Sequence, residues 1–301
     1  MEIDFNEASR FPARASHLLP AGLAARIRIW NKAHLQPLSP VLGLSILSVI
    51  RYEHPLNERV RTLLRLEDLF DKVAFFSAQE EPYDHHAALV ILFEILDVTG
   101  RADMKSELLQ ELDRQKQALE LLCKSPENPE GELDLDQILD DIQTSSQDLR
   151  TVAGKIGEHM RDNEWLMGIK QRVGLPGGAC EFDLPSYRYW LHLDPEVRRS
   201  DLNEWVAPLL PIEKSFRILL HLLRDTGKTE NHIANKGMFQ QMGAGKTAHL
   251  LSLKLDESLP CVPEISAHKF ALTIRFVVSS SRQKTRIYEE DVEFDLTSCT
   301  L

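Results

Sequence analysis

Residues 269–276, KFALTIRF, place a large apolar side chain at every second position. This period of two puts the apolar residues on one face of an extended strand and leaves the opposite face to solvent. The same alternation occurs in residues 186–193 (SYRYWLHL), 251–256 (LSLKLD) and 291–296 (DVEFDL). Strands with one buried and one solvent-exposed face are typical of antiparallel sheets, so we expect antiparallel pairing.

Upstream of most of these strands, the apolar residues recur at the spacing of α-helices. Asn57 is a good N-cap for the first helix, and Gly100 ends the second, whose nearly all-apolar composition is typical of the centre of a bundle. A further pair of helices, residues 194–225, interrupts the strands. This order predicts an α+β fold, with an N-terminal helical bundle domain and an antiparallel β-rich domain that contains the inserted helical pair. The expected bundle helices are residues 57–73, 87–98, 103–122, 135–150 and 153–172.

The chain divides into three expected parts. Residues 1–50 form an appended, weakly ordered arm, because prolines interrupt every short apolar stretch there. Residues 51–178 hold the helical domain, and residues 179–301 hold the β-rich domain. A start codon assigned too early would explain the arm, and Val49 is a plausible true start if its codon were GTG.

Charge and apolar content exclude several classes of protein. The formal net charge of −11 argues against a nucleic-acid binder or a binder of anionic membranes, which need an excess of cations. Residues 127–148 contain eight acidic residues and no Lys or Arg, so −8 of the −11 lies there and the remaining −3 leaves room for a local basic patch. The four cysteines have no paired spacing, and the longest apolar run, residues 41–50, falls far short of the roughly 20 residues of a membrane span. We therefore expect a soluble, cytoplasmic protein.

No motif predicts an enzyme. Residues 243–247 (GAGKT) resemble part of a nucleotide-binding P-loop, but Gln240 replaces the first glycine of that motif and an alternating strand follows in place of a helix. A flexible loop is the favoured interpretation, and a nucleotide-hydrolysing enzyme is the first rival. His85 and His86 point to different sides of a helix and cannot comfortably share one metal ion, so cap or surface roles are expected. We expect no catalytic residue, no metal and no cofactor.

Several cations lie on the expected helices and strands. Arg61 and Arg65 are one turn apart on the first helix, although like charges at that spacing repel. Each cation alone is most simply a solvated surface charge, and Arg101 is by default a cation at a helix C-terminus. Pairing within the chain is an equally supported alternative, because one expected strand is acidic at Asp291, Glu293 and Asp295. On the other strands, Arg188 shares a face with Trp190 and His192, and Lys269 shares a face with Arg275.

Four stretches closely resemble a known family. They are residues 52–67 (YEHPLNERVRTLLRLE), 107–115 (ELLQELDRQ), 175–193 (LPGGACEFDLPSYRYWLHL) and 263–276 (PEISAHKFALTIRF). Together they are similar to the ZapD family, also called YacF, the Z-ring-associated cell-division factors of proteobacteria. The resemblance runs in order from about Arg51 to the C-terminus, whereas the first fifty residues match nothing in the family.

The resemblance implies a cytoplasmic, non-enzymatic homodimer that is recruited to the mid-cell division site and takes part in septation and the cell cycle. Such proteins bind the tubulin-like GTPase FtsZ, capture its acidic C-terminal tail with basic residues, bundle its protofilaments in the Z-ring and slow its GTP turnover. Glu164 and Ala271 stand where some relatives carry basic residues. A structural dimeric scaffold for another acidic partner is the alternative, and neither nucleic acid nor membrane is an expected partner. Carried over position by position, the partner-binding residues are Arg61, Arg65, Arg101, Lys269, Arg275 and Arg188, the last in place of a histidine.

Overall fold

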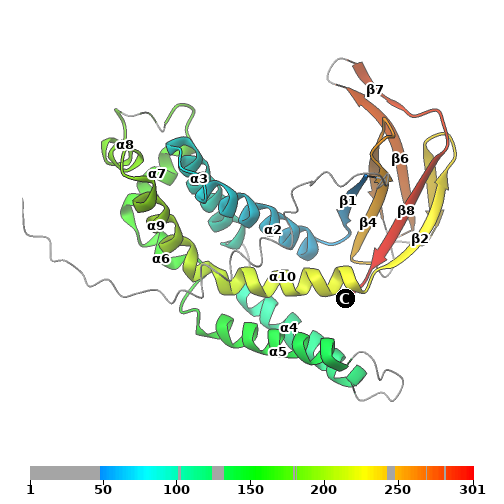
Figure 1. Cartoon of the computed structure of the whole chain (residues 1–301), viewed down its shortest axis with the longest axis horizontal. Coiled ribbons are helices and arrows are strands. Elements are labelled where there is room, and N and C mark those ends of the chain that lie inside the picture. The colour runs from blue at the N-terminus through cyan, green and yellow to red at the C-terminus, as the bar shows by residue number, and fades with distance from the viewer. Residues whose placement is uncertain are drawn as a thin grey trace, which may run out of the picture. The chain divides into compact units, whose positions relative to one another are not determined.

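The computed structural model describes residues 48–100, 103–123, 132–178, 180, 182–242, 248–268, 270–280 and 283–301. The predicted arm lies outside the described residues as far as residue 47, whereas Val49 and Ile50 belong to the first strand. The elements, shown in Figure 1, are β1 (Val49–Pro55), α2 (Glu58–Ser77), α3 (Pro82–Thr99), α4 (Met104–Cys123), α5 (Glu132–Thr151), α6 (Glu158–Arg161), α7 (Glu164–Val173), α8 (Pro185–Leu191), α9 (Pro195–Val206), the 3-10 turn η1 (Ala207–Leu209), α10 (Leu210–Asp225), β2 (Lys228–Ala234), β3 (Met238–Met242), β4 (Leu250–Asp256), β5 (Val262–Ala267), β6 (Ala271–Ser280), β7 (Gln283–Ile287) and β8 (Val292–Cys299).

Capping side chains set the starts of two of the helices, α2 and α7. Asn57 caps α2, because its side-chain oxygen accepts a hydrogen bond from the Val60 backbone N–H at 2.8 Å. The predicted helices over 57–73, 87–98, 103–122 and 135–150 are confirmed as α2 to α5. The predicted helix over 153–172 is instead two helices, α6 and α7, because Asn163 interrupts it and caps α7 through the Leu166 N–H. No helix in the described ranges is long and apolar enough to cross a membrane.

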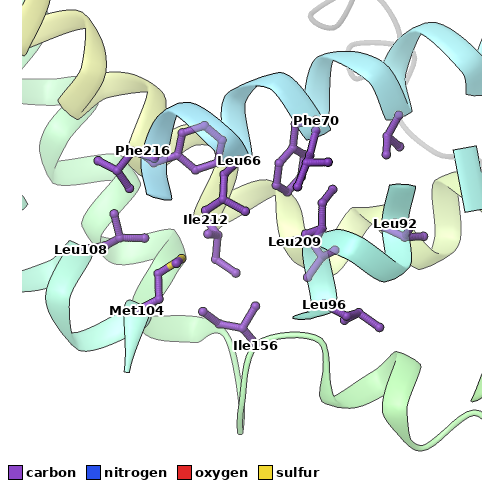
Figure 2. Close-up of a cluster of buried hydrophobic side chains, with 14 of the residues drawn as sticks. Leu66, Phe70, Leu92, Leu96, Met104, Leu108, Ile156, Leu209, Ile212 and Phe216 are labelled. Atoms are coloured by element: carbon purple, nitrogen blue, oxygen red, sulfur yellow. The ribbon is translucent and has the colours of Figure 1, made fainter. Parts of the chain in front are cut away.

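One hydrophobic cluster holds the helices together. Figure 2 shows Leu66 and Phe70 of α2 beside Phe216 of α10, with Leu92 and Leu96 of α3 completing one side. The Phe70 and Phe216 rings lie 5.6 Å apart between centroids, within the range that favours aromatic packing. Because α10 packs against α2, α4 and α5, it is the central helix of this cluster.

A second cluster lies between two antiparallel sheets. One sheet has the strand order β1-β4-β8-β2, and the other has the order β3-β6-β5 with β7 also paired to β6. Leu253 and Phe294 from the first sheet pack with Ile274 and Phe276 from the second, so these apolar residues are buried as the sequence predicts. Ser252 of β4 is buried as well, although the alternation places it on the solvent face.

The predicted strands at 251–256 and 291–296 are confirmed as β4 and β8, and the one predicted over 269–276 is confirmed from Ala271 onward as β6. Phe270, predicted to lie on the buried face, precedes β6 and is 61% exposed, and Lys269 lies outside the described residues. The α+β fold is therefore confirmed.

The predicted strand over 186–193 is wrong, because those residues form helix α8 and the turn that follows it. Pro185 begins the helix, where its fixed φ is favourable and its missing N–H is not needed. Tyr187 and Trp190, three residues apart, are buried, while Tyr189 between them is 70% exposed. A stretch of seven residues with apolar side chains at these positions fits either period, and packing against the bundle selects the helix. The helical pair predicted over 194–225 is confirmed as α9 and α10.

The two clusters do not divide the chain at residue 178. Helices α8 to α10 belong to the helical cluster, whereas β1, at the start of the described chain, belongs to a sheet. Arg224 of α10 joins the two, because its guanidinium contacts Glu53 of β1 at 2.8 Å and Glu67 of α2 at 2.7 Å. This ion-pair network fixes the connection between β1 and α2.

Candidate partner-binding site

Arg61 and Arg65 lie in the first two turns of α2, directly after β1 (Figure 1), and both contact Glu58. The Nε of Arg61 is 3.5 Å from one Glu58 carboxylate oxygen, and a guanidinium nitrogen of Arg65 is 3.7 Å from the other. Helical side chains lean toward the N-terminus, which lets Arg65 reach back two turns. We call Arg61 and Arg65 the α2 cation pair.

The α2 cation pair keeps a net positive charge. Two guanidinium groups share one carboxylate, and the N-terminus of α2 adds the positive end of a helix dipole, equivalent to roughly half a charge. The Arg61 and Arg65 side chains are 44% and 58% exposed, so their donors are open to a ligand. A carboxylate-bearing ligand is the chemical class that such a site binds.

Arg59, on the same helix, has a different role. Its guanidinium is 2.6 Å from Glu111 of α4, whose side chain is only 5% exposed. Burial disfavours the charged form of Glu111, but hydrogen bonds from Arg114 and Gln115 and the charge of Arg59 outweigh it, so the pKa of that carboxyl stays below its usual value. Arg59 is therefore a structural partner that ties α2 to α4.

His54 lies close enough to the α2 cation pair to sense it. Partial burial and the charge of Arg61 both lower the pKa of His54 below its ordinary value. The imidazole is therefore neutral at neutral pH and adds no charge. Sequence reasoning missed both His54 and Glu58 as neighbours of the site, although Glu58 was detectable from its spacing of three residues before Arg61.

Arg275, on β6, pairs with a carboxylate that strand order selects. The register of β5 and β6 places Glu264 directly opposite Arg275, and their charged atoms are 2.9 Å apart. The acidic stretch 291–296 is not its neighbour, because β8 pairs with β4 and β2. The alternative of pairing within the chain is therefore observed for this cation, with Glu264 in place of Asp291, Glu293 or Asp295.

Arg188 does not share a strand face with Trp190 and His192, because all three lie in or next to helix α8. The backbone C=O of Arg188 is 3.1 Å from Nδ1 of His192, one turn later. Trp190 is buried and donates its indole N–H to Asp201 at 2.8 Å. Helix α8, which carries Arg188, contributes to the helical cluster, whereas β6, which carries Arg275, contributes to the cluster between the sheets.

Two other predicted cations, Arg101 and Lys269, lie outside the described residues, as does the 243–247 loop. Arg161 of α6 lies beside the C-terminus of α3. Its guanidinium donates to the backbone C=O of Leu96 at 2.9 Å, near the C-terminus of α3.

The expected surface role of His85 is wrong, because its side chain is fully buried. Its Nδ1 accepts a hydrogen bond from Nε of Arg198 at 2.9 Å, and its Nε2 lies 2.8 Å from the Gln79 C=O. His86 instead places its Nδ1 2.6 Å from the Tyr187 hydroxyl. In the part of the chain that the structure describes, no group of three or more His, Cys, Asp or Glu side chains is placed to hold a metal ion.

Comparisons with known proteins identify the family. The sequence model of ZapD, described as "Cell division protein", matches residues 64–275. The chain is 56% identical over 256 residues to "Cell division protein ZapD" of Nitrosomonas europaea, which covers 85% of this chain and 97% of the relative. It is 54% identical to the protein of that name in Nitrosomonas eutropha (84% of this chain, 100% of the relative) and 50% identical to the one in Chromobacterium violaceum (83% and 99%). The chain therefore belongs to the ZapD family of cell-division proteins.

Proposed function

We propose that this chain is a non-enzymatic cell-division factor that binds the acidic C-terminal tail of the tubulin-like GTPase FtsZ. By doing so it bundles FtsZ protofilaments, promotes assembly of the Z-ring at mid-cell and slows GTP turnover by FtsZ. Family membership supports the role in cell division. The observation that carries the proposed binding chemistry is the α2 cation pair, in which two exposed guanidinium groups share one carboxylate.

Arginine is well suited to an acidic tail. Its planar guanidinium binds a carboxylate through two parallel hydrogen bonds, which fixes geometry as well as charge. Because the chain as a whole carries a net charge of −11, attraction to a negative filament must be local. Binding should weaken with salt, since charges exposed to solvent interact over a Debye length of about 8–10 Å.

Bundling requires at least two tail sites on one particle. A homodimer with one site per subunit supplies them through a symmetric interface. Each site can then be weak, because simultaneous engagement of two tails on neighbouring filaments raises the effective affinity by orders of magnitude.

Sedimentation of polymerised FtsZ tests the proposal. Wild-type protein should pellet with the filaments at low salt, and the double variant Arg61→Ala/Arg65→Ala should bind about 2- to 30-fold more weakly, from the loss of two exposed ion pairs. The matched control is Lys72→Ala/Arg150→Ala, which removes two other exposed helical cations that are paired with Asp68 and Asp113. Equal pelleting of the two double variants would contradict the proposed site.

The alternative is a structural dimeric scaffold that binds another acidic partner. FtsZ from which the C-terminal tail has been deleted separates the two, because pelleting should be lost with the tail only if the tail is the ligand. Retained pelleting with tail-less FtsZ would reject the tail as the ligand.

A further inference from the structure

Three of the arginines predicted to bind a partner, Arg61, Arg65 and Arg275, are already paired with carboxylates of this chain. Glu58 contacts both members of the α2 cation pair, and Glu264 contacts Arg275. If these arginines bind an acidic segment, as the proposed function requires, the ligand competes with these carboxylates for the guanidinium groups. We propose that Glu58 and Glu264 are tethered competitors, which weaken the binding of acidic segments and select for ligands with several carboxylates close together.

The geometry of Glu58 is that of an exchangeable partner. Its contacts with Arg61 and Arg65 are 3.5 and 3.7 Å long, and its side chain is 74% exposed. Arg59, on the same helix as Glu58, is instead 2.6 Å from Glu111 of α4, whose side chain is only 5% exposed. Glu58 is open to water and ligands, whereas the Glu111 side chain is almost fully buried, so the contacts of Glu58 can be replaced at the lower cost.

Glu264 meets the same conditions on a strand. The register of β5 and β6 keeps it opposite Arg275, and both side chains are about half exposed, at 45% and 53%. Its contact is shorter, 2.9 Å, because the two residues face each other across neighbouring strands. A ligand carboxylate that contacts Arg275 must therefore take the place of Glu264.

The size of the effect follows from the weakness of exposed ion pairs. Such pairs favour the paired state over the open state by roughly 1.4- to 5-fold. If the ligand binds only an arginine whose ion pair is open, its dissociation constant is multiplied by one plus that ratio, which is a factor of roughly two to six. A ligand with a single carboxylate exchanges one ion pair for another, whereas a segment with several can neutralise both members of the α2 cation pair and displace Glu58 with a net gain.

The test is a titration of the full-length chain with a peptide of the FtsZ C-terminal tail. Glu58→Gln and Glu264→Gln should each lower the dissociation constant roughly two- to six-fold, and the dependence of affinity on salt should become steeper, because salt no longer weakens a competitor as well. The matched controls are Glu94→Gln on α3 and Glu293→Gln on β8. Both carboxylates are exposed, and neither has an ion-pair partner among the described residues.

The outcomes separate this proposal from the proposed function. The dissociation constant could be unchanged or higher in both Glu58→Gln and Glu264→Gln while Arg61→Ala still weakens binding. That result would overturn the proposal that these glutamates compete with the ligand and would leave the proposed function intact. An equal gain in the control variants would also overturn that proposal, since it would show a general effect of net charge. Absence of tail binding by the wild-type chain would reject the proposed function, and the competitors with it. Because Glu264 is remote from the α2 cap, its variant tests the idea even if Glu58→Gln disturbs that helix.

Discussion

Replacing Arg198 with methionine removes the most heavily bonded buried cation of the helical cluster. Arg198 is 3% exposed and has no carboxylate partner among the described residues. Its guanidinium donates to Nδ1 of His85 at 2.9 Å, to the C=O of Glu80 at 2.6 Å, to the C=O of Leu191 at 2.9 Å and to the C=O of Leu193. It therefore ties α9 to the α2–α3 turn and to the end of α8.

The expected cost follows from this inventory. Methionine fills most of the volume and removes the desolvation penalty of the charge, but it leaves four acceptors without their donor. A buried acceptor without a partner costs about 1–3 kcal/mol, and water can reach some of these carbonyls once the side chain has changed. We expect a loss of about 3 kcal/mol in the free energy of unfolding, or about 6–12 °C in Tm at roughly 2–4 °C per kcal/mol.

Tryptophan fluorescence during urea unfolding measures this loss. Three of the four tryptophans, Trp165, Trp190 and Trp205, have ring centroids within 6.0 Å of one another beside α9, so they report on this region. The control is Arg199→Met. Arg199 pairs with a 79% exposed glutamate and makes one longer hydrogen bond, 3.2 Å, to the C=O of Gln79, so its loss should cost about 1 kcal/mol. Equal losses in the two variants, or a loss below about 1 kcal/mol for Arg198→Met, would contradict a stabilising role of the Arg198 hydrogen bonds.

Three further predictions concern stability. Burial, more than the nearby cations, lowers the pKa of His85 below 6.5, so below about pH 6.5 the unfolded chain binds a proton that the folded chain does not. The free energy of unfolding should therefore fall as the pH falls below 6.5. Unfolding curves at several pH values should show that His85→Gln flattens this dependence. Gly157 has a φ of +72° and no room for a Cβ, so Gly157→Ala should lower the free energy of unfolding by about 1–3 kcal/mol. Gly168 lies in open space within α7, so Gly168→Ala should raise the free energy of unfolding by about 0.5–1 kcal/mol. Equal effects of the two variants in urea titrations would contradict this prediction. Arg224→Met should leave the carboxylates of Glu53 and Glu67 without the cation between them and lower the free energy of unfolding by about 1–3 kcal/mol. Amide hydrogen exchange should then accelerate first in β1. Uniform acceleration along the chain would contradict a local role of Arg224 between β1 and α2.

Local patterns predict most of the fold because they are read over a few residues. The N-cap at Asn57 and the strand over residues 251–256 depend only on neighbours in the chain, and both are confirmed. Residues 186–193 fail as a predicted strand because a short run with two buried aromatic positions fits two periods. Only packing against the bundle, which the local pattern does not contain, selects the helix.

The candidate site is predictable to the same extent. The proximity of Arg61 and Arg65 follows from helical spacing alone, and the structure places them on one carboxylate. The partner of Arg275 depends on which strand lies beside β6, and sequence alternation does not specify strand order. The hydrogen bond that satisfies the buried His85 comes from Arg198, which is 113 residues away in the sequence. The local sequence pattern around His85 does not predict such a contact.

The most direct test of the central claim, that the start of α2 is an anion site for the FtsZ tail, is a titration of the tail peptide onto the full chain at several salt concentrations. Binding should weaken steadily as salt rises, should fall about 2- to 30-fold in Arg61→Ala/Arg65→Ala and should be unchanged in Lys72→Ala. Binding that is insensitive to salt, or that persists undiminished without the two arginines, would contradict an anion site at the start of α2.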